Sequence, residues 1–182
     1  MQIQKWAYVS AVFMFSISAF AGQAGNSNSS LQASIIGSMP NLTIGGVSSA
    51  GASWAVSQSN VSIQPNSQSR WDIQVQVQNL LLVSGPGVGT TGSVRAVAAS
   101  VVCGGSGGAV VATTPSAVLD RSGAAQIQTT VNLPRACWAP VVLVRIASGT
   151  AVGSFIASTG LTLNSSNSGV GNSNNSEDDN DK

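Results

Sequence analysis

The sequence predicts an all-β fold: an antiparallel β-sandwich of immunoglobulin-like style, with about seven to eight strands and one disulfide. Three observations predict it. Apolar and polar residues alternate along several segments, turn-forming residues separate these segments at short intervals, and no segment shows the 3.6-residue apolar period of an amphipathic helix.

The alternation is clearest over residues 71–78, where Trp, Ile and two Val are separated by Asp and three Gln. Residues 125–133 repeat this pattern, which predicts strands with one buried face. Residues 141–146 are apolar at nearly every position, as in a central strand covered on both faces. Further strands are expected near residues 53–63, 94–103, 109–113 and 154–158, with turns rich in Gly, Pro, Asn and Asp between them.

The two ends of the chain depart from the β pattern. Lys5 precedes an apolar run over residues 6–20, and Ala19-Phe20-Ala21 has the small-x-small form of a signal peptidase site. A membrane anchor is the alternative, but about twenty apolar residues are needed to span a bilayer. We therefore expect residues 1–21 to be a signal peptide, 22–30 a flexible lead-in, 31–163 the β-sandwich domain and 164–182 a disordered Asn/Ser/acidic tail.

Export and charge together limit the expected partners. An exported chain of this kind is expected in the periplasm, at the cell surface or in the medium. After removal of residues 1–21, six Lys and Arg balance six Asp and Glu. Without a basic excess, neither nucleic acid nor an anionic membrane is an expected partner, and no membrane span is expected. An unknown protein or glycan partner and self-association stay open.

The chain has two cysteines, Cys103 and Cys137. In an oxidising compartment they are expected to form a disulfide, and closing a loop of this length stabilises a fold by about 3–4 kcal/mol. A metal or redox pair is the alternative. The spacing matches no metal-binding pattern and the chain contains no histidine to complete a site, so no metal is expected.

Residue types also limit the chemistry. Without histidine there is no Ser-His-Asp or Cys-His system, and residues 31–163 lack the Lys needed for Ser-Lys or Schiff-base catalysis. The acids of this segment are Asp72 and Asp120. A glycosidase or aspartic protease would need them to face each other across a cleft. Because Asp72 lies on a Gln-bearing outward face and Asp120 begins a tight turn, we expect no catalytic residues and no enzyme.

Residues 87–92 (Gly-Val-Gly-Thr-Thr-Gly) have the glycine spacing of a dinucleotide-binding loop. That motif needs a following helix whose N-terminus holds the pyrophosphate. Residues 93–103 contain four valines and are expected to form a strand instead. The segment is therefore predicted to be an inter-strand loop, and no cofactor is expected.

Three tryptophans follow the signal segment. Trp71 shares a strand face with Ile73 and Val75 and is expected in the core. Trp54 and Trp138 are open between core packing and ligand contact, because exposed indoles stack on sugar rings in carbohydrate-binding modules.

The segments around the cysteines resemble a family of exported bacterial β-sandwich proteins. The matching residues are Val101-Val102-Cys103-Gly104-Gly105, Val111-Ala112-Thr113-Thr114 and Leu133-Pro134-Arg135-Ala136-Cys137-Trp138-Ala139-Pro140, with the likeness extending over residues 52–160. The pattern is thus Cys-Gly-Gly … Leu-Pro-x-x-Cys-x-Ala-Pro. Trp138 departs from the aliphatic residue expected there. The resemblance implies an exported domain and implies no activity and no site residues.

These observations favour an exported, non-catalytic domain working in adhesion, surface structure or ligand binding. A self-assembling surface subunit is one alternative, because strands so poor in charge lack the Lys and Glu that guard sheet edges. A carbohydrate-binding module that uses Trp54 or Trp138 is the other.

Overall fold

The computed structural model describes residues 30–68 and 70–160 of the 182-residue chain. The predicted signal peptide, residues 22–29 of the predicted lead-in and the predicted tail lie outside these ranges. The described part has the all-β antiparallel fold that the sequence predicts, with strands from Leu31 to Thr159 and one short 3-10 turn, η1 (Gly105–Gly107).

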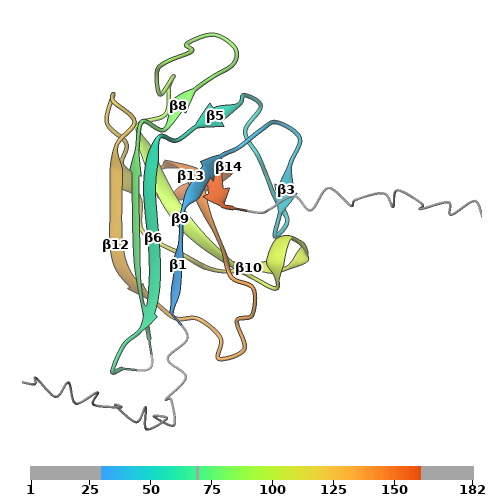
Figure 1. Cartoon of the computed structure of the whole chain (residues 1–182), viewed down its shortest axis with the longest axis vertical. Helices are drawn as coiled ribbons and strands as arrows, with labels where there is room; N and C mark the ends of the chain where they lie inside the picture. The colour runs from blue at the N-terminus through green and yellow to red at the C-terminus, as the bar shows by residue number, and fades with distance from the viewer. Residues whose placement is uncertain (1–29, 69, 161–182) are drawn as a thin grey trace, which may run out of the picture.

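Two antiparallel sheets face each other across a shared core (Figure 1). In spatial order, sheet A consists of β1 (Leu31–Ala33), β6 (Gln58–Pro65), β7 (Trp71–Gln78) and β12 (Ala125–Val131). Sheet B consists of β10 (Ala109–Thr113), β9 (Ala96–Cys103), β13 (Val141–Ser148), β14 (Ala151–Thr159) and β2 (Ile35–Gly37), and β11 (Ala117–Val118) also pairs with β9. Two small sheets complete the fold: β3 (Thr43–Ile44) with β4 (Val47–Ser48), and β5 (Trp54–Ala55) with β8 (Leu81–Leu82).

The core between the sheets follows from the alternation in the sequence. Every second residue of β6 and β7 points inward, and the intervening polar residues point to solvent. Sheet B supplies the facing side chains, including alternate residues of β9 and β13. The buried apolar residues that meet here include Val61, Ile63, Ile73, Val75 and Val77 from sheet A and Val97, Val101, Val142, Val144 and Ile156 from sheet B. Trp71 packs against this core as predicted.

A second, smaller core lies on the outer face of sheet B. Ile44, Val102, Val141, Leu143 and Phe155 are buried together there. The hairpin of β3 and β4 supplies Ile44, and Leu42 and Val47 beside it pack against the cluster. Sheet B is therefore covered on both faces, which confirms the prediction for the apolar segment that begins at Val141.

One side of the sandwich is closed by the chain itself. The backbone leaves β1 in sheet A and enters β2 in sheet B after a single residue, Ser34. Ser59 on β6 fixes this crossing, because its Oγ accepts a hydrogen bond from the Ile35 amide at 2.7 Å and donates one to the Ile35 carbonyl at 3.1 Å.

Non-consecutive strands pair at β7–β12 and β9–β13. The immunoglobulin-like assignment of this order stays a prediction.

Candidate functional site

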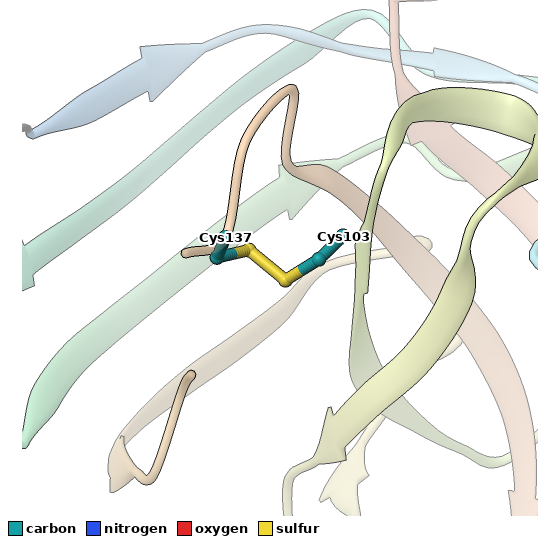
Figure 2. The surroundings of a disulfide bond; sticks show 2 residues. All are labelled: Cys103 and Cys137. Carbon is teal, nitrogen blue, oxygen red and sulfur yellow. A yellow bond between two sulfur atoms is a disulfide. The ribbon is translucent and has the colours of Figure 1, made fainter. Parts of the chain in front are cut away.

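The two cysteines form the predicted disulfide. Figure 2 shows Cys103, at the end of β9, bonded to Cys137 in the loop over residues 132–140 that connects β12 to β13. Their Cα atoms lie 5.0 Å apart. A disulfide in a small β domain is more typical of extracytoplasmic proteins than of cytosolic ones. We call residues 132–140 the cysteine loop.

The cysteine loop is also pinned by its backbone. The Gly104 amide donates to the Trp138 carbonyl at 2.8 Å, and the Gly105 amide donates to the Ala139 carbonyl at 3.0 Å. Within the loop, the Cys137 amide donates to the Pro134 carbonyl at 3.2 Å. Together with the disulfide, these bonds hold the loop against the turn that contains η1.

Trp138 projects from this pinned loop with 70% of its surface exposed, the only exposed tryptophan of the described residues. A Cβ placed on Gly104 would come within 3.7 Å of its Cζ2, so the edge of the indole lies beside the glycine backbone. Gly104 has a φ of 97°, a value that L side chains rarely adopt, so the turn favours a glycine at this position. A large aromatic surface thus faces solvent from a backbone with little freedom.

Trp54 has the opposite position. It lies on β5 in the main core with 6% of its surface exposed, and its Nε1 has no hydrogen-bond partner among the described residues. The sequence left core packing and ligand contact open for Trp54, and the structure places it in the core. Its role as a candidate ligand contact is corrected, because a buried ring cannot stack on a sugar.

A half-enclosed apolar depression of about 170 Å³ lies on the inner side of the cysteine loop. It sits at the end of the core, and its lining residues include Leu31, Ile63, Trp71, Leu133, Cys137 and Pro140. The loop therefore has apolar surface in two places: this depression and the exposed ring of Trp138.

The two aspartates of the domain lie at opposite ends of sheet A. Asp72 is near the start of β7, where its Oδ1 accepts hydrogen bonds from Asn66 Nδ2 at 2.9 Å and Thr130 Oγ1 at 2.8 Å. Asp120 lies beside Gln78 at the other end of that strand. Six residues of extended strand span about 20 Å, far beyond the separation of a catalytic carboxylate pair.

Asp120 is a turn residue. Its Oδ1 accepts hydrogen bonds from Ser122 Oγ at 2.6 Å and from the Ala124 amide at 2.8 Å. These bonds lower the pKa of Asp120 below its usual value because they favour the charged carboxylate, and the bond from Ser122 has the largest effect. A general acid would need the opposite shift.

The outer face of sheet A is an array of uncharged amides. Cross-strand register places Asn60, Gln76 and Gln126 in one row and Gln74 beside Gln128 in the next. Asp72 is the only charged residue on the four strands of this sheet. The side chains that make up the array are Gln32, Gln58, Asn60, Gln64, Gln74, Gln76, Gln78, Gln126 and Gln128.

The glycine-rich segment at residues 87–92 is an inter-strand loop, as predicted. It follows β8, and the chain then enters strand β9 rather than a helix. Thr90 Oγ1 donates to the Gly87 carbonyl at 2.6 Å, which closes the loop on itself. The helix N-terminus that a dinucleotide phosphate needs is absent from this position.

Within residues 30–68 and 70–160, no group of three or more His, Cys, Asp or Glu side chains is placed to hold a metal ion. The same part of the chain contains no helix with the length and apolar character to cross a membrane. No protein-family model, curated protein or solved structure matches the chain.

Proposed function

We propose that this chain is an exported, non-catalytic domain that binds a ligand at its surface, in the periplasm, at the cell surface or in the medium. The observation that carries the proposal is Trp138, an exposed indole on a loop pinned by a disulfide and two backbone hydrogen bonds. Rigid, exposed aromatic residues contribute most of the binding energy in many interfaces, because little entropy is lost when they bind.

A neutral glycan is the ligand class that fits this loop best. An indole face stacks on the apolar C–H face of a sugar ring, while its polar edge stays free for hydrogen bonds. Arg135 is the only charged residue of the cysteine loop, and Gly104 and Gly105 beside it add no side chains that would shield the ring. The separation of Asp72 from Asp120 and the lowered pKa of Asp120 support binding without hydrolysis.

The test is a titration of the full chain, expressed with its own N-terminus in a secretory host, with a panel of neutral oligosaccharides. We expect at least one of them to bind and to change tryptophan emission. Trp138→Ala should then weaken binding roughly tenfold or more, since it removes the central contact.

Val88→Ala is the matched control. Val88 is an exposed apolar residue in the loop between β8 and β9, at the end of the molecule opposite the cysteine loop (Figure 1). This variant should bind as the unmodified protein does. Equal affinities of the Trp138→Ala and unmodified proteins, or no binding across the panel, would contradict the glycan proposal.

A self-assembling surface subunit is the second candidate function. It is favoured by a different observation, the uncharged edge strand β12 of sheet A.

A further inference from the structure

Each sheet of a sandwich has two edges, and an open edge offers unpaired backbone N–H and C=O groups to another strand. On one side of this protein, the passage of the chain from β1 into β2 closes both sheets. On the other side, sheet A ends at β12, and sheet B ends at β10 and β11. Figure 1 shows β12 along the outer margin of the sandwich.

The edge of sheet B is interrupted in ways that hinder pairing with another chain. The register between β10 and β9 shifts between Val110 and Ala112, which is a bulge at the edge. Pro115, which has no amide hydrogen, then separates β10 from the two-residue strand β11. Bulges, prolines and short strands are the usual means by which proteins protect sheet edges.

β12 has no bulge and no proline, and the one charge on its backbone lies near its end, where the Arg70 guanidinium donates to the Thr130 carbonyl at 3.2 Å. Its seven residues pair with β7 without a register shift, and the strand contains no charge and no proline. Gln126 and Gln128 point to solvent, whereas Ile127 and Val131 are buried. This edge is therefore long and regular, and none of its own side chains carries a charge.

An exposed apolar side chain lies beside the same edge. Val118 on β11 is 75% exposed, the largest exposed fraction among the large apolar residues of the described chain. Val118 and Gln126 both line a shallow depression of about 390 Å³. Its neighbour on β11, Ala117, packs against the main core, so the Val118 side chain points away from that core and is exposed in the single chain.

We propose that β12 pairs antiparallel with β12 of a second copy of this chain, about a two-fold axis at Gln128. That axis places Gln128 opposite Gln128 of the other copy and Gln126 opposite Thr130, and uses the whole strand Ala125–Val131. A glutamine amide both donates and accepts, so a Gln–Gln pair across the axis is self-complementary. The outer amide array of sheet A then continues through both copies.

The geometry gives a closed dimer rather than a fibre. A fibre of sheets would need β12 of one copy to pair with the opposite edge, β1, of the next. β1 has three residues, and the chain then turns away into sheet B. When β12 pairs with β12 of a second copy, the open backbone N–H and C=O groups of both edges are hydrogen-bonded in one contact. This inference does not rest on glycan binding by Trp138, which lies outside β12.

Sedimentation velocity over a concentration series tests the dimer on the full chain from a secretory host. We expect a reversible monomer–dimer equilibrium. Gln128→Lys places two like charges across the axis and should raise the dimer dissociation constant roughly tenfold or more. Gln128→Glu should act in the same way. Mixing the two variants should restore a dimer, because opposite charges then meet at the axis.

Two further variants distinguish this edge from other surfaces. Gln58→Lys adds the same charge to the outer face of sheet A, but on β6, and should leave the equilibrium unchanged. Val118→Asp should weaken the dimer. A monomer at every concentration would overturn the proposal. So would a dimer that Gln58→Lys disrupts as strongly as Gln128→Lys, or a lysine–glutamate mixture that stays monomeric.

Discussion

Replacing Phe155 by alanine is expected to lower the free energy of unfolding by about 3–5 kcal/mol. Phe155 is fully buried in the second core, on the face of sheet B that points away from sheet A. The segment after the β3–β4 hairpin is fixed beside it, since Ser49 forms a parallel bridge with Phe155 and the Ala50 amide donates to the Phe155 carbonyl at 2.8 Å. The truncation would leave a cavity that these backbone contacts prevent from collapsing.

Urea unfolding followed by intrinsic fluorescence measures this effect. Ile36→Ala is the control, because Ile36 is also a large apolar strand residue in sheet B but half of its surface is exposed. We expect the control to cost less than about 1 kcal/mol. Equal losses in the two variants would contradict the second core, because they would mean that Phe155 is not covered.

Removing the disulfide by the double substitution Cys103→Ala and Cys137→Ala is expected to cost about 3–4 kcal/mol on the chain-entropy account. The bridge closes a loop with a sequence separation of 34 and holds the cysteine loop against β9. The double variant avoids a single free thiol, which would complicate the measurement.

Its stability should match that of the unmodified protein unfolded under a reductant, because both lack the same cross-link. A reductant should leave the double variant unchanged. If the reductant did not alter the unmodified protein either, the account of the bridge as a major stabilising element would be wrong.

The main core was predictable from the sequence because one face of each long strand in sheet A is solvated. Residues 71–78 alternate strictly, so their inward residues could be named individually, and all but the half-buried Trp71 are buried. The nearly apolar segment 141–146 indicated burial on both faces, and Val141 to Val144 are buried, whereas Arg145 and Ile146 are partly buried. The disulfide was predictable because the chain has two cysteines and was expected to be exported.

The second core could not be predicted in the same way. β3 and β4 have two residues each, too few to show any period, and they cover a strand that follows about 100 residues later in the chain. Residues 53–63 were expected as one strand but divide into β5 and β6, which belong to different sheets.

The candidate site was predicted only as a choice between Trp54 and Trp138. Both tryptophans have small neighbours in sequence, so local pattern does not separate them. The difference is tertiary: Trp54 pairs across to Leu82 on β8 and is covered by the main core, whereas Trp138 lies outside any strand. The edge role of β12 likewise depends on which strands neighbour it in space.

The central claim is that Trp138 presents an exposed indole while Trp54 is buried, and acrylamide quenching of tryptophan emission tests it most directly. Trp138→Phe should remove the red-shifted, most strongly quenched part of the emission and leave a bluer, less quenched remainder from the buried Trp54 and the half-buried Trp71. If the variant kept the full quenchable emission, Trp138 would not be the exposed ring, and the proposed binding surface would fall with it.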